Sequence, residues 1–154
     1  MSQLLHEGKA KQVWTTGRAD QYRLKFKDDA TAFNGKKKAR IEGKGKFNLR
    51  FSELIFNLFN QVNISNHYVE TLSEDEMLVQ AVEIIPVEVI VRNYAAGSLV
   101  KRLGFERGAK LSQSLIEFNL KSDELDDPLL TPDHIFLMEL ASESDLEQMK
   151  QLAK

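Results

Sequence analysis

Residues 47–62 constrain the fold most, because apolar side chains recur there at the spacing of one helix face. The residues at this spacing are Phe47, Phe51, Leu54, Ile55, Leu58, Phe59 and Val62. Such a period predicts an amphipathic helix that buries one side. Short segments with the alternating pattern of strands lie before and after it, so we expect the helix to cover a sheet in an α+β fold.

Extended segments dominate the first half of the chain. Residues 4–16 and 21–29 read as two strands joined by the turn-rich break Gly17–Asp20, which predicts a β-hairpin. Residues 67–70 and 77–82 read as two further short strands around a polar turn. Between these pairs, residues 30–46 combine three glycines with many lysines and little apolar period, which predicts a long basic loop.

The second half mixes strands and helices. Residues 87–91 and 115–121 are the strand candidates, and the first of them directly follows Pro86. A short helix is expected from Gly97 to Leu103, with Ser98 at its start and Gly104 at its end. Thr131 and Ser142 each precede acidic residues, so each is expected to open a helix.

Composition divides the chain near residues 83–86, where a β-rich half passes to a mixed half. We therefore expect two lobes, residues 1–84 and 85–154. The 154 residues include 42% hydrophobic and 29% charged residues, which is typical of globular protein. Without cysteine the chain has no disulfide, Cys-based zinc site or thiol nucleophile. No apolar run approaches the ~20 residues of a membrane helix, so we expect a cytoplasmic protein with no membrane partner.

Charge is distributed unevenly although the net charge is only −2. Residues 25–50 hold nine Lys or Arg against three acids, whereas residues 115–154 hold ten acids against three Lys. The basic segment predicts an anionic ligand in the first half. The acidic segment would repel nucleic acid, which we do not expect as a partner.

Two lysine-containing segments could contact phosphates. In Gly8–Lys9–Ala10–Lys11, glycine allows close approach to the backbone and the two lysines share one face. The alternative is an edge strand that lysines protect from aggregation. The run Lys36–Lys38, with Arg40, Lys44 and Lys46 nearby, could likewise surround an anion or simply be solvated.

The segment from Ile85 to Ser98 carries the most chemical information. An apolar strand ends in Arg92 and then turns through small residues into a helix start at Gly97–Ser98. This order brings together a guanidinium, a hydroxyl and backbone N–H groups, which indicates an oxyanion or phosphate site. Alternatively, Arg92 pairs with Glu88 on the same strand face and Ser98 is only a helix cap.

A magnesium site is a further hypothesis. Asp123, Asp126 and Asp127 could offer the oxygen ligands that this ion prefers. Acidic turns before proline also occur without a metal, so the metal ligands are unknown from the sequence.

Several of these motifs together resemble one known family. The motifs are EGKAKQVW, DDATAFNGKKK, GKGKFN, IIPVEVIVRNYAAGSLVKRLG and LKSDELDDPLLTPDHI, which follow one another over nearly the whole chain. In order and spacing they resemble the SAICAR synthetase (phosphoribosylaminoimidazole-succinocarboxamide synthase) family. The resemblance implies an ATP-dependent ligase of purine biosynthesis that joins aspartate to carboxyaminoimidazole ribonucleotide, with Mg²⁺. It also implies a β-rich, kinase-like ATP lobe, a hinge and an α/β lobe.

The resemblance assigns nucleotide-binding roles to residues of the matching motifs. The residues expected to line the phosphates and adenine of ATP are Lys9, Ala10, Lys11 and Val13. Glu83 and Ile84 would form the hinge beside the adenine edge, and Lys121 would lie near the ribose.

The resemblance also implies substrate and catalytic roles. Arg92 and Ser98 would bind the carboxylate or phosphate of the imidazole nucleotide. The turn Asn34–Gly35, together with Lys44, would border the substrate cleft. Arg92 and Lys44 are the cations expected to act on the reacting oxygens, because activation of a carboxylate by ATP requires cations more than a protein nucleophile.

The sequence also departs from the family. The later motifs D-x-K-x-E-F-G and D-E-x-S-P-D are absent, and Leu49 replaces a usual Asn. Three hypotheses follow. The first is an active ligase whose Mg²⁺ ligands come from Asp123, Asp126 or Asp127, or from another subunit of a homo-oligomer. The second is a truncated nucleotide-binding remnant without turnover, with a partial α/β lobe. The third is a basic RNA-binding module.

Overall fold

The computed structural model describes residues 2–32 and 37–154 and has the predicted α+β fold. The chain divides into two compact units, Met1–Glu83 (unit 1) and Ile84–Lys154 (unit 2). Each unit has its own hydrophobic core. In the described residues, no helix is both long and apolar enough to span a membrane.

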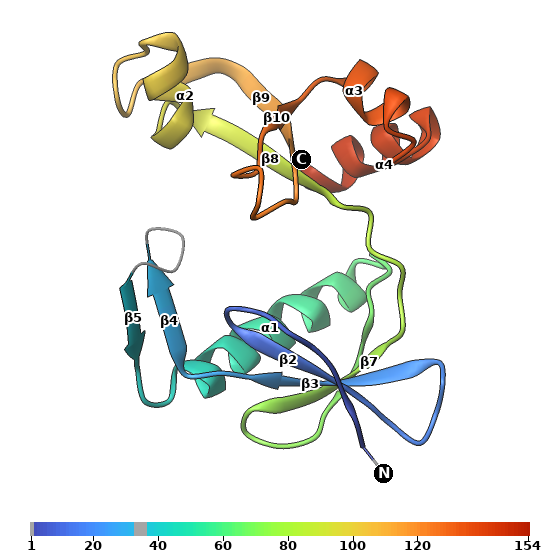
Figure 1. The fold of residues 1–154 in the computed structure, drawn as a ribbon. Helices are drawn as coiled ribbons and strands as arrows, with labels where there is room; N and C mark the ends of the chain where they lie inside the picture. Colours follow the sequence, from blue (N-terminus) through green and yellow to red (C-terminus); the bar gives the residue numbers. More distant parts are fainter. Residues whose placement is uncertain (1, 33–36) are drawn as a thin grey trace. The chain divides into compact units, whose positions relative to one another are not determined.

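Unit 1 is an antiparallel sheet with one long helix, α1, packed on it (Figure 1). The strand order in the sheet is β1-β2-β3-β7-β6. A separate two-stranded hairpin, β4 and β5, precedes the helix. The element bounds are β1 Leu4–Glu7, β2 Lys11–Thr15, β3 Gln21–Phe26, β4 Asp29–Ala32, β5 Lys37–Arg40, α1 Lys44–Gln61, β6 Tyr68–Thr71 and β7 Glu76–Gln80.

Residues 4–16 form two strands rather than the single strand predicted. The Gly8 N–H donates to the Lys11 carbonyl at 2.8 Å, which closes a turn between β1 and β2. The strand pattern continues across this turn, so the sequence period did not reveal it. The next hairpin was predicted correctly, since β2 and β3 pair with Val13 opposite Leu24.

The predicted helix α1 is confirmed, but most of its predicted buried face is wrong. Leu49 is fully buried and packs in the sheet core with Leu24, Phe26, Met77 and Val79, and Phe56 packs against that core. Five of the residues used to predict the face are exposed instead: Phe47, Phe51, Leu54, Leu58 and Val62. The helix is apolar on two sides, and its period alone does not say which side meets the sheet.

The predicted basic loop at residues 30–46 is also wrong. Ala30 lies opposite Ala39 in the β4–β5 hairpin, and α1 already begins at Lys44. A two-stranded ribbon pairs through backbone groups, so it can form without an apolar period in its sequence.

Unit 2 is a three-stranded antiparallel sheet in the order β10-β9-β8, with three helices. Its bounds are β8 Val87–Tyr94, α2 Gly97–Leu103, β9 Lys110–Leu120, β10 Leu129–Leu130, α3 Pro132–Leu137 and α4 Glu143–Ala153. Strands β8 and β9 extend beyond the predicted segments because they pair with each other as far as Tyr94 opposite Lys110.

The helix boundaries of unit 2 follow their capping residues. The Thr131 and Ser142 hydroxyls accept hydrogen bonds from backbone N–H groups in the first turns of α3 and α4, as predicted. Gly104 ends α2 with a φ of 70°, also as predicted. Ser98, in contrast, is not a cap: the N-cap of α2 is Ala96, and no side chain caps it.

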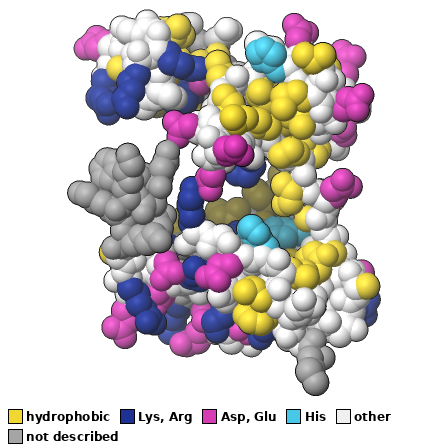
Figure 2. Space-filling view, in the orientation of Figure 1, with side chains coloured by type: hydrophobic (Ala, Val, Ile, Leu, Met, Phe, Trp, Pro, Cys, Tyr) yellow, Lys and Arg dark blue, Asp and Glu magenta, His cyan; other side chains and the backbone are white. Residues whose placement is uncertain are grey.

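The two faces of the β8–β9 pair differ in character. Val87, Phe118 and Leu120 project into the core with Ile135 of α3 and Leu146 of α4. The alternate residues, including Arg92 and Glu117, lie on the opposite face. Hydrophobic side chains also gather on the outer surface of unit 2 near α3 (Figure 2), where Phe136, Leu137 and Met138 are exposed.

Candidate functional site

The polar face of β8 and β9 places two arginines around one carboxylate. Arg92 lies opposite Leu115, and Glu117 lies opposite Ile90, so Arg92 and Glu117 are diagonal neighbours on one face. Arg102 reaches the same carboxylate from the last turn of α2. Strand pairing and one short helix therefore assemble this cluster from three separate segments.

The contacts of Arg92 fix its guanidinium group. Arg92 Nε donates to Glu117 Oε2 at 2.7 Å, and Arg92 Nη2 donates to the Ser98 hydroxyl at 2.9 Å. Arg92 Nη1 lies 3.4 Å from the Ala96 carbonyl, which accepts a weaker hydrogen bond. Arg102 donates to the other oxygen, Oε1, of Glu117. The structure thus brings together the predicted pair Arg92 and Ser98.

The electrostatics of this cluster favour an ionised Glu117 and a net positive charge. Burial raises the pKa of Glu117, but hydrogen bonds from Arg102 and Arg92 outweigh it, so that the pKa lies below 4.5. The side chains of Glu117 and Arg92 are 10% and 14% exposed. Two guanidinium groups share one carboxylate, which leaves one positive charge on the cluster of Arg92, Arg102 and Glu117.

The alternative pairing of Arg92 with Glu88 is wrong, because Glu117 is the acidic partner of Arg92. Residues 88 and 92 are four apart on one strand, whereas Glu117 approaches from the neighbouring strand, where cross-strand side chains lie closer. Gly97 contributes to the same geometry, since its φ of 55° is a left-handed conformation that favours glycine.

Four of the predicted nucleotide residues lie in the β1–β2 turn or in β2. Lys9 and Ala10 lie in the turn, and the Ala10 carbonyl accepts a hydrogen bond from the Lys27 N–H at 2.8 Å. Lys11 begins β2, with its ammonium 5.6 Å from the centre of the Phe26 ring. Val13 packs against the core on the face that α1 covers. The exposed lysines and the close backbone turn suit an anionic ligand.

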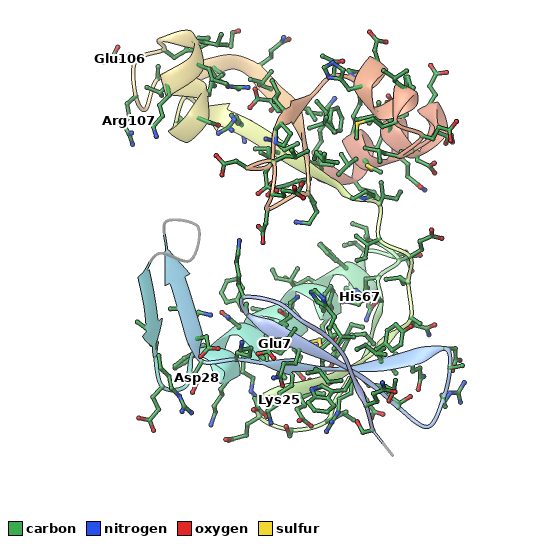
Figure 3. The ribbon with its side chains drawn as sticks, in the orientation of Figure 1. Glu7, Lys25, Asp28, His67, Glu106 and Arg107 are labelled. Atoms are coloured by element: carbon green, nitrogen blue, oxygen red, sulfur yellow. The ribbon has the colours of Figure 1, made fainter. Side chains whose placement is uncertain are left out.

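His67 lies directly before β6 in the same unit, and the sequence did not indicate it as a site residue (Figure 3). Its ring meets the Phe56 ring edge-on, with centroids 5.0 Å apart. Burial lowers the pKa of His67 below 6.5, and the nearby charge of Lys11 lowers it further. Both effects favour the neutral form of the His67 ring.

Lys44 is placed by a close backbone contact at the start of α1. Its ammonium donates to the Asp29 carbonyl at 2.9 Å, and the next residue, Gly45, donates its N–H to Asp28 Oδ1 at 2.9 Å. Asp28 lies beside the first turn of α1 (Figure 3). A Cβ atom on Gly45 would lie 2.7 Å from the Phe26 carbonyl oxygen, so only glycine fits there.

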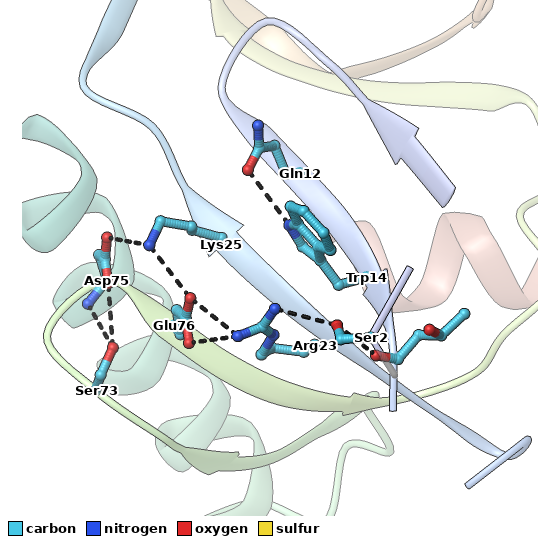
Figure 4. Close-up of polar contacts among 9 residues, drawn as sticks. Ser2, Gln12, Trp14, Arg23, Lys25, Ser73, Asp75 and Glu76 are labelled. Carbon is cyan, nitrogen blue, oxygen red and sulfur yellow. Dashed lines mark hydrogen bonds and ion pairs between the residues drawn. The ribbon is translucent and has the colours of Figure 1, made fainter. Parts of the chain in front are cut away.

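Many cations of the basic segment already have acidic partners within unit 1. Lys27 pairs with Glu7 and Asp29, and Lys46 pairs with Glu74. On the sheet face shown in Figure 4, Glu76 accepts from Arg23 at 3.2 Å and from Lys25 at 3.3 Å. The Arg23 guanidinium lies 5.4 Å from the centre of the Trp14 ring. The positive balance of residues 25–50 is therefore partly neutralised.

The remaining predicted residues lie near the boundary between the units. Glu83 and Ile84 lie in the extended segment between β7 and β8, and both are exposed. Lys121 directly follows β9 and is exposed, and its backbone N–H donates to the Pro86 carbonyl at 2.9 Å. Asn34 and Gly35 lie outside the described residues.

The magnesium hypothesis gains no support from the acidic turn. Within residues 2–32 and 37–154, no three His, Asp or Glu side chains are grouped as metal ligands. Asp127 Oδ1 instead accepts from the Ser122 N–H at 2.8 Å. The assignment of Asp123, Asp126 and Asp127 as magnesium ligands therefore stays a prediction.

A hollow of about 710 Å³ lies between α3 and α4, away from this chemistry. Phe136, Glu143 and Glu147 are among its lining residues, and no predicted site residue lines it. Its lining is dominated by α4, and we assign it no role.

Sequence reasoning missed Glu117 and Arg102 as parts of the unit 2 site. Glu117 is a charged residue among the apolar residues 115–118 of a strand. A charged residue in such a segment usually has a partner, so its position could have indicated a site residue. Arg102 lies four residues after Ser98, on the same side of α2. Neither signal identifies Arg92 as the common partner until the register of β8 and β9 is known.

The fold and the two cationic clusters define an α+β protein suited to anionic ligands. Residues 4–154 match the family model of SAICAR synthetase. The chain belongs to the SAICAR synthetase family.

Known relatives match almost all of this chain. The phosphoribosylaminoimidazole-succinocarboxamide synthase of Staphylococcus saprophyticus is 49% identical over 150 residues, which are 97% of this chain and 64% of the relative. The crystal structure of the Ehrlichia chaffeensis enzyme has a TM-score of 0.93 at 36% identity, covering 98% of this chain and 64% of that one. A SAICAR synthetase in complex with ADP has a TM-score of 0.90 at 36% identity, covering 96% and 63%. The chain spans slightly less than two thirds of these relatives.

Proposed function

We propose that this chain carries the ATP-binding and imidazole-nucleotide-binding parts of an ATP-dependent ligase of purine biosynthesis. The ligase joins aspartate to carboxyaminoimidazole ribonucleotide, and its products are the succinocarboxamide, ADP and phosphate. Residues 1–84 form the nucleotide lobe and residues 85–154 form part of the substrate lobe. The proposed location is the cytoplasm.

The observation that carries this proposal is the contact between Arg92 and Ser98 on the polar face of unit 2. Both residues belong to the motif IIPVEVIVRNYAAGS, through which the chain resembles its family. A guanidinium that already donates to a hydroxyl offers planar, charged donors to a carboxylate or phosphate. We assign Arg92 and Ser98 to the imidazole nucleotide.

The reaction requires activation of a carboxylate. The γ-phosphoryl group of ATP is transferred to a carboxylate oxygen of the imidazole nucleotide, and the bond to ADP breaks. The aspartate amine then attacks the acyl carbon and phosphate leaves, with loss of a proton from the amine. Arg92 would neutralise the substrate anion, and Lys44 would offer a cation at the border of the cleft with Asn34 and Gly35.

Unit 1 supplies the proposed nucleotide contacts. Lys9, Ala10, Lys11 and Val13 would contact the phosphates and adenine, because they combine exposed cations with a tight backbone turn and an apolar surface. Glu83 and Ile84 would meet the adenine edge, and Lys121 the ribose. The ADP complex of a 36% identical relative supports nucleotide binding, and the individual contacts are our proposal.

A second candidate is nucleotide binding without turnover. It is favoured by the length of the match, because the chain spans only 64% of the Staphylococcus saprophyticus relative. The family's magnesium ion would then need ligands from elsewhere, such as a second copy of this chain, and we derive no step through it.

A turnover assay on purified protein of known oligomeric state tests both candidates. ADP and succinocarboxamide are measured with ATP, Mg²⁺, aspartate and carboxyaminoimidazole ribonucleotide, and each substrate is omitted in turn. Product that requires all three substrates supports the ligase. Binding of ATP without any product would contradict it and support the second candidate.

A further inference from the structure

Glu117 joins two guanidinium groups that the sequence places ten residues apart. Its Oε2 accepts from Arg92 Nε at 2.7 Å, and its Oε1 accepts from Arg102 Nη2. The Glu117 side chain is 10% exposed, whereas that of Arg102 is 32% exposed. The carboxylate and Arg92 are therefore both largely buried, and Arg102 lies nearer to solvent.

The same contacts leave part of Arg92 available to a ligand. A guanidinium has five N–H donors. In the described part of the chain, the hydrogen bonds of Arg92 go to Glu117, the Ala96 carbonyl and Ser98, and these occupy three donors. Two donors, one on each terminal nitrogen, remain for an external oxyanion.

From these contacts we propose that Glu117 is a positioning residue, which holds Arg92 in its ligand-binding orientation and keeps Arg102 beside it as a second cation. This inference rests on the proposed function, because Arg92 is assigned there to the imidazole nucleotide. Glu117 itself does not touch the ligand. Its role is to fix the guanidinium before the anion arrives, which lowers the entropy lost on binding.

Glutamine is an informative replacement because it has nearly the shape of glutamate. Its single amide oxygen can accept from one arginine, while its NH₂ group faces the other. Glu117→Gln therefore releases one guanidinium without leaving a cavity. We expect binding of carboxyaminoimidazole ribonucleotide to weaken about tenfold, which corresponds to loss of one charge-assisted hydrogen bond. We expect ATP binding to change less than twofold.

The test measures both affinities by titration calorimetry and the melting temperature of each variant. Glu147→Gln is the matched control, since Glu147 forms an exposed pair with Lys150 at 3.5 Å on α4. It should leave both affinities unchanged. Glu117→Asp, which keeps the charge, should bind the imidazole nucleotide more tightly than Glu117→Gln.

A double-mutant cycle separates positioning from general folding. If Glu117 acts mainly through Arg92, then Glu117→Gln should weaken binding by much less than tenfold in an Arg92→Ala background, where only the contribution of Arg102 remains to be lost. A full tenfold loss in that background, or equal losses for both ligands, would overturn the proposal.

A ligand-independent readout distinguishes this proposal from the proposed function. The Arg92 Nε–H signal in ¹H–¹⁵N spectra should be protected from exchange in the wild type and much less protected in Glu117→Gln. Unchanged protection would overturn the positioning role. A second outcome is that the protection depends on Glu117 but the protein does not bind the imidazole nucleotide. This outcome would overturn only the assignment of that ligand to Arg92.

Discussion

The cations of the two units are held in different ways. In unit 2, Arg92 is largely buried and bonded to a carboxylate and a hydroxyl. In unit 1, Lys11 is exposed, and its ammonium lies over the face of the Phe26 ring. A fixed planar guanidinium selects ligand geometry, whereas a flexible ammonium mainly supplies charge. We infer that unit 2 provides more of the specificity for its anion than unit 1 does.

The strongest test of this difference replaces one cation in each unit by alanine. Arg92→Ala should weaken binding of carboxyaminoimidazole ribonucleotide about 100-fold, because two charge-assisted hydrogen bonds to the ligand are lost. ATP binding should change less than twofold. Lys11→Ala should show the reverse pattern with a smaller loss, about fivefold for ATP, because an exposed charge is screened by water.

Titration calorimetry with each ligand measures these four affinities. Equal losses of both ligands in Arg92→Ala would show that Arg92 mainly stabilises the fold through Glu117. The proposed difference between the two units would then be wrong, because Arg92 would not bind its anion specifically.

A second prediction concerns how unit 1 places Lys44. Gly45→Ala should destabilise the protein by about 2 kcal/mol, because its Cβ would overlap the Phe26 carbonyl and disturb the bond to Asp28. Urea unfolding followed by fluorescence of Trp14, the single tryptophan, reports this change in unit 1. Gly17→Ala is the control, since no atom lies within 4 Å of its Cβ. A stable Gly45→Ala protein would show that the contact does not position α1.

The smallest expected effect is a difference in pH response. Burial and Lys11 lower the pKa of His67, so His67 binds a proton more readily in the unfolded chain. The stability of unit 1 should therefore decrease as the pH falls below 6.5. The pKa of Glu117 is also lowered, so its contribution to unit 2 is present above pH 4.5 and is lost only as the pH falls further.

Urea unfolding between pH 7.5 and 5 checks this prediction through Trp14 fluorescence. His67→Gln should flatten the dependence over this range. An identical slope in His67→Gln would mean that another group of unit 1 titrates there.

Sequence reasoning predicted elements more reliably than contacts. The caps Thr131 and Ser142, the end of α2 at Gly104 and the β2–β3 hairpin were found from local chemistry. The β4–β5 hairpin and the β1–β2 turn were missed because backbone pairing leaves little trace in side-chain type. Most of the predicted face of α1 was wrong because the helix has apolar residues on two sides.

The sequence by itself determined the α+β class and the helix at residues 47–61, and it offered the grouping of Arg92 with Ser98 as one of two alternatives. These depend on local period, on capping residues and on spacing within one segment. The partner of Arg92 depended on tertiary structure. Glu117 lies 25 residues away in the chain and reaches Arg92 only through the register of β8 and β9, which sets which side chains share a face.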